Sequence, residues 1–185
     1  MLKKKELLII GVCGTIITCG VYFILHFSQK NSRVLPILVH PNPALRQVTH
    51  QINNVDYSVI SLSNSMIATL QSLAVTDFFF HGSLPRGLAA TQVGVPKRLF
   101  VCGINGKIKV LINPKIIERM GTYISHEGCL SLPGQKEKSL KRSAYVKLKY
   151  KDLKNRERTL VARNRYAALV EHEIDHLNGI MNIDY

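Results

Sequence analysis

Two histidines and a glutamate near the end of the sequence have the spacing of a metal site. His172, Glu173 and His176 form the pattern His-Glu-x-x-His inside residues 166–178, a stretch that is predicted to be helical and to end at Gly179. Side chains four residues apart lie on one side of a helix, so both imidazoles can bind one divalent ion while the glutamate borders the open coordination position. A catalytic metal site is therefore favoured over a pair of surface histidines.

A catalytic site of this kind needs a third protein ligand. Only nine residues follow His176, and among them Asp184 is the sole candidate, since Asn182 stands where some proteases carry a third histidine. The ligand is therefore expected upstream, where Cys129 is one candidate. It lies in residues 127–134, whose glycines and proline suit a loop or strand end that presents sulfur. Taken alone, this cysteine could equally be a buried structural residue.

An amphipathic helix is predicted in the first half of the chain, because apolar residues recur there at steps of three and four. Asn54 or Asp56 is expected to cap it. The helix would pack its apolar stripe against the core. The stripe consists of Val55, Val59, Leu62, Met66, Leu70 and Leu73.

Strands are expected to form the rest of the framework. Two apolar runs, 98–104 and 107–112, are joined by Asn105-Gly106 and predict a β-hairpin. Residues 145–150 alternate between apolar and lysine side chains, and residues 158–163 are expected to return beside them. Hairpins with helices before and after them predict an α+β domain, with antiparallel sheets packed around the metal-bearing helix.

The composition fits one globular domain. With 185 residues, 46% hydrophobic and 20% charged, the chain is too apolar for a disordered protein. Four cysteines are too few for a disulfide scaffold of this length.

Positive charge is concentrated in one region. The net charge is +13, and residues 136–165 hold twelve lysines and arginines against three acids. A solvated face of the sheet is one interpretation, and a contact surface for RNA or the ribosome is the other. No aromatic-rich RNA-binding signature accompanies these charges.

The N-terminal end predicts a membrane segment. Residues 7–27 are 21 residues without Asp, Glu, Lys or Arg, which is long enough for a helix to span about 30 Å of hydrocarbon. We expect a transmembrane anchor over residues 1–27, a linker over 28–36 and the catalytic domain over 37–185. A cleaved signal peptide and a mitochondrial presequence are alternatives, but no small-x-small cleavage site follows. Lysine and arginine residues flank both ends of the segment, so the distribution of positive charge does not predict which end lies on the cytosolic side.

At its motifs the sequence resembles the peptide deformylase family, from about residue 37 to residue 184. The family motif Glu-Gly-Cys-Leu-Ser is intact at residues 127–131, and His-Glu-x-x-His is intact at residues 172–176. The first family motif, Gly-x-Gly-Leu-Ala-Ala-x-Gln, corresponds to residues 85–92, with Pro85 in place of its first glycine. Two shorter stretches are also similar to the family: residues 41–46 and Asn113-Pro114.

The resemblance implies a peptide-deformylase-like fold and removal of the formyl group from the N-terminal formylmethionine of new polypeptides. It implies that the metal is held by Cys129, His172 and His176. Glu173 would take the proton of the attacking water and pass it to the departing amine. The family typically uses Fe²⁺, and Zn²⁺, Ni²⁺ or Co²⁺ can replace it, because a thiolate and two imidazoles accept several metals.

The resemblance also assigns groups around the metal. The side chain of Gln92 and the backbone N–H of Leu130 would stabilise the tetrahedral oxyanion. Glu127 would orient a ligand through Arg142. Contacts to the substrate are expected from Gly87, Leu88, Ala168 and Leu169.

Two positions depart from the family pattern. Pro85 lacks an N–H and fixes φ where the family has glycine, and Arg86 places a cation where an apolar residue usually lines the methionine pocket. Both are expected to weaken the substrate fit. The expected partners are formylmethionyl nascent polypeptides, and a ferrous thiolate centre favours a reducing compartment, hence the cytosolic side of the membrane.

Two other functions remain open at this point. A membrane-bound metalloprotease with the His-Glu-x-x-His motif would cleave internal peptide bonds and would not need Cys129. A catalytically weakened ribosome- or membrane-associated protein would keep the metal as a structural group.

Overall fold

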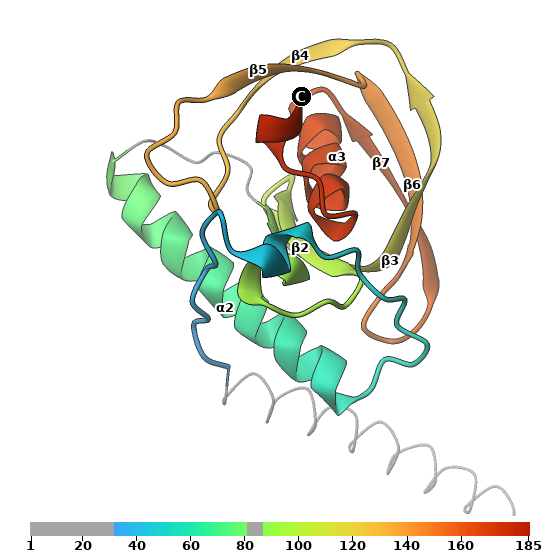
Figure 1. The fold of residues 1–185 in the computed structure, drawn as a ribbon. Coiled ribbons are helices and arrows are strands. Elements are labelled where there is room, and N and C mark those ends of the chain that lie inside the picture. Colours follow the sequence, from blue (N-terminus) through green and yellow to red (C-terminus); the bar gives the residue numbers. More distant parts are fainter. Residues whose placement is uncertain (1–31, 81–86) are drawn as a thin grey trace, which may run out of the picture.

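The computed structural model describes residues 32–80 and 87–185 (Figure 1). The predicted anchor, residues 1–27, lies outside these residues, as do Pro85 and Arg86. Within the described ranges, no helix combines the length and the apolar character that a membrane span requires.

Two antiparallel sheets form the framework of the domain. The larger has the strand order β1-β2-β3-β6-β7, and the smaller pairs β4 with β5. The strands are β1 (Gly87–Ala89), β2 (Leu99–Ile104), β3 (Lys107–Met120), β4 (Tyr123–Glu127), β5 (Lys138–Arg142), β6 (Tyr145–Lys151) and β7 (Glu157–Arg163). The predicted α+β class with antiparallel sheets is confirmed.

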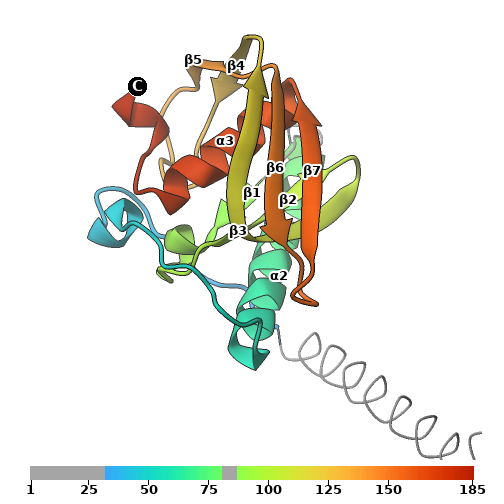
Figure 2. The same ribbon diagram turned by 90° about the vertical axis from the view of Figure 1, so that its right-hand side faces the viewer.

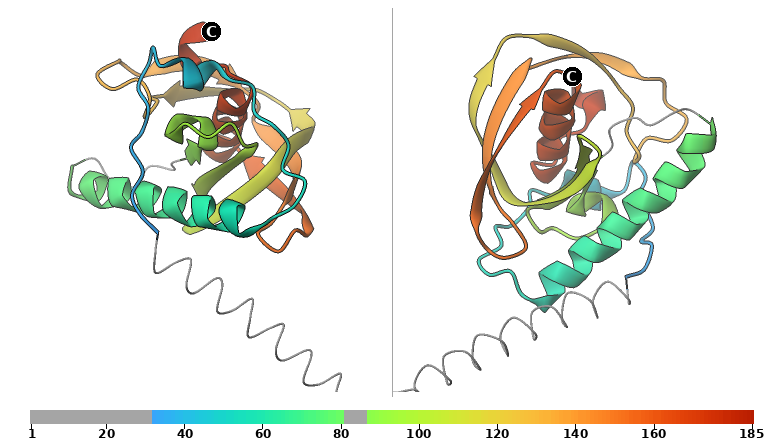
Figure 3. Two further views of the ribbon diagram at one scale, coloured as in Figure 1. Left: turned by 60° about the horizontal axis from the view of Figure 1, so that its bottom comes forward. Right: turned by 180° about the vertical axis from the view of Figure 1, so that it is seen from behind.

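Two helices pack on opposite faces of strand β2. The helical elements are α2 (Tyr57–Phe80), α3 (Arg165–Leu177), and the short 3-10 turns η1 (Pro43–Arg46), η2 (Ala90–Val93) and η3 (Asn182–Asp184). Side chains alternate along a strand, so Phe100 packs in one core cluster with Val170 of α3 while Val101 packs in another with Met66 of α2. Helix α3 therefore lies inside the curve of the sheets and α2 lies outside it (Figures 1 and 3).

The local predictions for the hairpins and for α2 are confirmed. Asn105 and Gly106 both have positive φ, 51° and 71°, which is the geometry of a tight hairpin turn between β2 and β3. Strands β6 and β7 pair along their whole lengths. Helix α2 begins at Tyr57, and the Asp56 carboxylate caps it by accepting a hydrogen bond from the Val59 N–H at 3.0 Å.

Strands β3, β4 and β5 differ from the sequence predictions. The predicted strand ended at residue 112, but β3 runs on to Met120 through an irregularity at Asn113-Pro114. The Asn113 side chain accepts a hydrogen bond from the Ile52 N–H and donates one to the Ile52 carbonyl, which stabilises the break. Strands β4 and β5 were not predicted, because both are short and rich in polar residues.

Candidate metal centre

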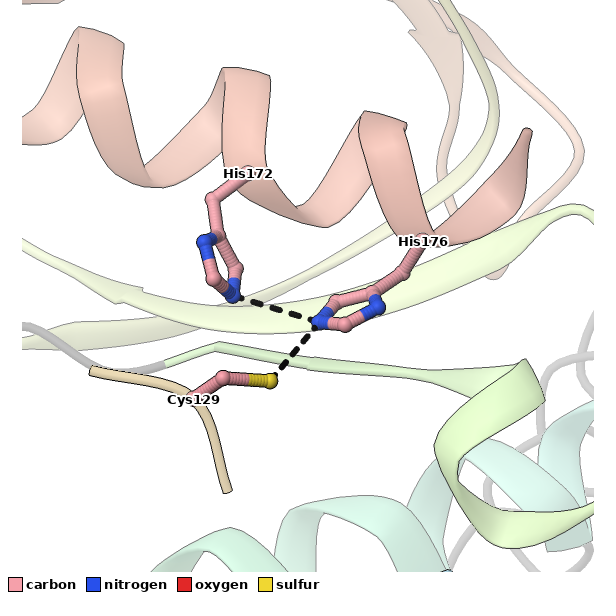
Figure 4. Close-up of side chains that lie close together, drawn as sticks. All are labelled: Cys129, His172 and His176. Carbon is pink, nitrogen blue, oxygen red and sulfur yellow. Dashed lines mark hydrogen bonds between the residues drawn. The ribbon is translucent and has the colours of Figure 1, made fainter. Parts of the chain in front are cut away.

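Helix α3 presents two imidazoles to a single sulfur atom. His172 and His176 project from one side of α3 toward Cys129, which lies in the turn after β4 (Figure 4). The Nε2 atom of His176 lies 3.2 Å from Nε2 of His172 and 3.3 Å from Sγ of Cys129. The three donor atoms lie within 4.8 Å of one another, and both imidazoles are buried. The structure thus brings the three predicted ligands together.

The spacing of these donors suits one tetrahedral ion. Metal–nitrogen bonds of about 2.0–2.1 Å and a metal–sulfur bond of about 2.3 Å place neighbouring donors roughly 3.3–3.6 Å apart. The two contacts of His176, 3.2 and 3.3 Å, are close to that range, and Sγ of Cys129 lies within 4.8 Å of His172. A thiolate with two imidazoles is a donor set for divalent first-row metals. The residues present therefore fit the expected metal.

The turn that carries Cys129 is held by backbone hydrogen bonds. The Leu132 N–H donates to the Cys129 carbonyl at 2.9 Å and closes the turn. The His40 N–H donates to the Ser131 carbonyl at 2.9 Å, which ties the turn to the segment before η1. Cys129 is therefore presented by a fixed loop, as the glycines and proline around it suggested.

A buried ionic network supports His172 from behind. The imidazole Nδ1 donates to Oε2 of Glu127 at 2.9 Å, and Arg142 donates to both oxygens of that carboxylate at 2.8 and 2.9 Å. Arg142 also donates to Asp175 at 2.6 Å, and the hydroxyl of Tyr185 donates to the same carboxylate at 2.8 Å. Burial alone would raise the pKa of Glu127, but the hydrogen bonds from Arg142 and His172 lower it to about 2. Glu127 therefore stays ionised and holds the imidazole in one orientation.

Glu173 lies beside the ligands and packs directly on strand β1. Its Oε2 atom is buried and has no hydrogen-bond partner in the described part of the chain. Burial raises the pKa of its carboxyl to about 7; His172 opposes this shift, and the Glu127 and Asp175 carboxylates add to it. A Cβ atom on Gly87 would lie 2.2 Å from Oε1 of Glu173, so only glycine leaves room for the carboxylate there.

Gln92 places an amide group next to Cys129. Its Oε1 accepts a hydrogen bond from the Ala89 N–H at 2.9 Å, which fixes the direction of the amide. Its Nε2 then points to Ser131 Oγ at 3.2 Å and to Cys129 Sγ at 3.9 Å. Gln92 is buried, and the N–H groups of its amide are aimed at the ligand cluster.

The site opens into a cavity of about 480 Å³. Of the residues predicted to contact substrate, Gly87 and Leu169 line this cavity, whereas Leu88 and Ala168 are buried and are not part of its wall. Its wall also includes Gln92, Cys129, Leu130, His172 and Glu173. The predicted base, oxyanion groups and two of the ligands thus face one space.

Comparison with known proteins identifies the family. A family model described as polypeptide deformylase matches residues 34–185. The chain belongs to the polypeptide deformylase family. A peptide deformylase of Rhizobium meliloti (strain 1021) is 35% identical over 160 residues, covering 82% of this chain and 84% of that protein. The expectation of a peptide deformylase, a metal-dependent hydrolase, is therefore confirmed.

Solved deformylase structures have the same fold. The crystal structure of the Thermotoga maritima enzyme is similar with a TM-score of 0.71 and 31% identity, covering 82% of this chain and 97% of that one. The Met-Ala-Ser-bound class I type b deformylase of Acinetobacter baumannii is similar with a TM-score of 0.71 and 28% identity, covering 83% and 98%.

The hydrogen bonds that position the metal-binding helix α3 in this deformylase were not predicted from the sequence. Glu171 accepts hydrogen bonds from Arg119 at 2.9 Å and from the backbone and hydroxyl of Ser143 at 2.8 and 2.9 Å. These bonds attach α3 to β3 and to the turn between β5 and β6. Asp175 lies inside the His-Glu-x-x-His motif, so its position near the metal could have been predicted. Its ion pair with Arg142 could not, because only the tertiary fold brings these two residues together.

Proposed function

We propose that this chain hydrolyses the N-formyl group of formylmethionyl polypeptides, releasing formate and a free amino terminus. The supporting observation is that the donors of Cys129, His172 and His176 meet beside the buried carboxylate of Glu173 at one cavity. A divalent ion held by these donors supplies Lewis acidity and lowers the pKa of water toward neutrality.

Glu173 serves as both the general base and the general acid. It accepts a proton from the water whose oxygen bonds to the formyl carbon, and it delivers that proton to the nitrogen as the carbon–nitrogen bond breaks. A carboxyl with a pKa of about 7 suits both steps, because it is a competent acceptor and donor near neutral pH. The unpartnered Oε2 is available for these transfers.

Gln92 and Leu130 stabilise the negative charge that develops on the formyl oxygen. The amide of Gln92 cannot turn freely, since Ala89 holds its oxygen, so its N–H donors are already oriented. The backbone N–H of Leu130, next to Cys129 in the cavity wall, adds a second donor. Donors that need no reorganisation stabilise such charge most effectively.

The substrate is the amino-terminal end of a peptide. A cavity of about 480 Å³ suits a ligand of a few residues. The Met-Ala-Ser ligand of the Acinetobacter relative supports a peptide with methionine first. We assign Gly87 and Leu169 to its contacts, whereas Leu88 and Ala168 are buried neighbours of these two residues in the sequence and do not line the cavity.

Fe²⁺ is the proposed native metal, with Zn²⁺, Ni²⁺ or Co²⁺ as substitutes, because the donor set accepts all four. The test is release of formate from formyl-Met-Ala-Ser by the full chain, purified in detergent and loaded anaerobically with each metal. Formate release at one bound metal per chain is expected, with acetyl-Met-Ala-Ser as the control peptide. A fully loaded protein that releases no formate would refute the proposal and favour a structural metal.

The metalloprotease alternative makes the opposite prediction for Cys129. A deformylase needs the sulfur, so Cys129→Ser should lose tight metal binding and formate release together. Retained metal in Cys129→Ser, with cleavage of unformylated peptides at internal bonds, would support the protease.

We also propose that the basic region, residues 136–165, contacts the ribosome. Strands β3 and β6 lie side by side (Figure 2), and Lys149 of β6 pairs with Lys115 of β3, while Lys147 lies opposite Glu118. The surplus of lysine over acidic side chains on these strands is complementary to ribosomal RNA. Salt-sensitive cosedimentation with ribosomes, lost in a Lys115, Lys147 and Lys149 triple glutamine variant, is the expected result. Equal cosedimentation of the variant would contradict the contact.

The remaining proposal is that residues 7–27 anchor the chain in a membrane, with the catalytic domain on the cytosolic side. Formylated nascent chains and a reducing environment for Cys129 both favour that side. The protein should stay in the membrane fraction after alkaline carbonate extraction. Loss of the domain when protease is added to intact cells would overturn the orientation.

A further inference from the structure

Arg165 places a positive charge in the wall of the catalytic cavity, where none of the proposed steps uses a cation. It is the first residue of α3 and lies one helical turn before Leu169, which lines the same cavity. Glu173 lies eight positions later in α3, which corresponds to about 12 Å along a helix axis. Arg165 therefore stands near the reacting groups without touching them.

Among the residues that the structure describes, Arg165 has no carboxylate partner for its charge. Its contacts are with a neutral side chain: it donates to the Tyr166 hydroxyl at 3.3 Å and lies 5.0 Å from the centre of that ring. These contacts hold the guanidinium in place and leave its charge available to a ligand.

Helix stability does not explain this arginine. The first turn of α3 contains no acidic residue, so the cation adds to the positive end of the helix dipole, which is unfavourable. Besides the ligands and Glu127, the other charged side chains in the wall are Glu173, which is the proposed base, and Glu137, which lies beside Gly128, the residue before Cys129. The cavity is thus polarised, with its positive end at the start of α3.

We propose that Arg165 determines specificity by favouring formylated peptides with an acidic side chain at the second or third residue. The inference rests on the proposed function, since it assumes that the formyl group lies beside Cys129 and Glu173. An extended peptide advances about 3.3 Å per residue, so the second and third residues lie roughly 7–10 Å from the reacting end. That distance places their side chains within reach of an arginine whose backbone is about 12 Å away.

The test compares glutamate with its neutral isostere in matched peptides. The substrates are formyl-Met-Glu-Ser against formyl-Met-Gln-Ser, and formyl-Met-Ala-Glu against formyl-Met-Ala-Gln. For an exposed ion pair, the full chain should prefer glutamate in kcat/KM by about two- to fivefold at one position or both. The preference should fall at high salt. Arg165→Gln should bring the ratio to about one, and Arg165→Glu should reverse it.

Arg163 provides a matched control for the overall positive charge of the protein. It lies on β7, stacks on Tyr145 and is not part of the cavity wall. Arg163→Gln removes the same charge two residues away and should keep the wild-type preference. If Arg163→Gln lowers the preference as much as Arg165→Gln does, the effect is general attraction and the proposal fails.

A binding measurement separates this inference from the proposed function. The affinities of the unformylated peptides Met-Glu-Ser and Met-Gln-Ser for the zinc-loaded full chain can be measured by calorimetry without turnover. If formyl-Met-Ala-Ser is not hydrolysed, the proposed function fails, but the binding ratio still tests Arg165. An unchanged glutamate-to-glutamine ratio in Arg165→Gln, in binding and in kinetics, would overturn the proposal.

Discussion

Gly87→Ala tests whether the position of Glu173 controls the reaction. The added Cβ would lie 2.2 Å from Oε1, 2.4 Å from Cδ and 2.6 Å from Cγ of Glu173. Non-bonded carbons rest at about 3.5–4.0 Å, so the carboxylate must move by roughly 1 Å. Strand β1 cannot yield easily, because Gly87 pairs with Cys102 inside the sheet.

A displacement of this size is expected to lower kcat/KM by about 10²-fold, which is the usual cost of a 1 Å misplacement of a catalytic group. All of the atoms nearest to the added Cβ belong to Glu173, so metal binding should be retained. The assay is formate release from formyl-Met-Ala-Ser, with the metal content of each sample measured in parallel. In a Glu173→Ala background the same substitution should cost little, since the two changes disable one group.

Gly128→Ala is the matched variant. Gly128 also lines the cavity, but its added Cβ would meet no heavy atom closer than 3.9 Å, which is an ordinary contact. A loss of no more than about threefold is expected for it, because ordinary contacts need no displacement. If Gly87→Ala retains wild-type kcat/KM with full metal content, the assignment of Glu173 as the positioned base is wrong.

Other changes separate chemistry, metal binding and stability. Glu173→Gln should lower kcat by about 10²- to 10⁴-fold with metal content unchanged, and full activity would exclude its role. Glu127→Ala should weaken metal affinity by about 10- to 100-fold in chelator competition, since His172 loses its acceptor; unchanged affinity would contradict that role. Chelation should lower the melting temperature, and readdition of metal should restore it, whereas an identical melting curve would argue against a bound ion. Asp152→Asn should cost about 1 kcal/mol at pH 7 in urea unfolding, because Asp152 accepts hydrogen bonds from Arg156 and Arg158. Burial would raise the pKa of Asp152, but these hydrogen bonds lower it in the folded protein. The stabilisation is therefore full above about pH 4, and it should disappear as acid protonates the carboxylate of the folded protein. A difference in unfolding free energy between wild type and Asp152→Asn that does not change with pH would contradict this explanation.

Short sequence patterns correctly predicted those elements whose conformation is determined by residues close together in the sequence. The turn at Asn105-Gly106 needs positive φ at two consecutive positions, which few other residue pairs adopt, so the hairpin could be predicted from two residues. The metal helix was predicted because four-residue spacing aligns side chains in any α-helix. Neither inference required knowledge of the tertiary fold.

Elements without such signals could not be predicted. Strand β5 has only five residues, and Leu140 is its single apolar side chain, so it carries no apolar periodicity. The extension of β3 crosses Asn113-Pro114, a pair that normally ends a strand, and it depends on hydrogen bonds to Ile52, 61 residues earlier. The substrate wall was only partly anticipated, because whether Ala168 or Leu169 faces the cavity depends on the rotation of α3 against the sheets.

One carboxylate links the two parts of the metal centre. Glu127 lies two residues before Cys129 on the chain and accepts a hydrogen bond from His172, so the loop with the sulfur and the helix with the imidazoles are held together directly. Arg142 bridges Glu127 to Asp175, one residue before His176, and this fixes α3 against β4 and β5 a second time. Removing one member of a buried ionic network leaves the other charges unpaired, which is far more costly than losing an exposed pair. The motifs at 127–131 and 172–176 are therefore held together by one network of buried charges. The sequence predicted that the sulfur and the two imidazole nitrogens bind one metal, but the distances between these donor atoms depend on that network.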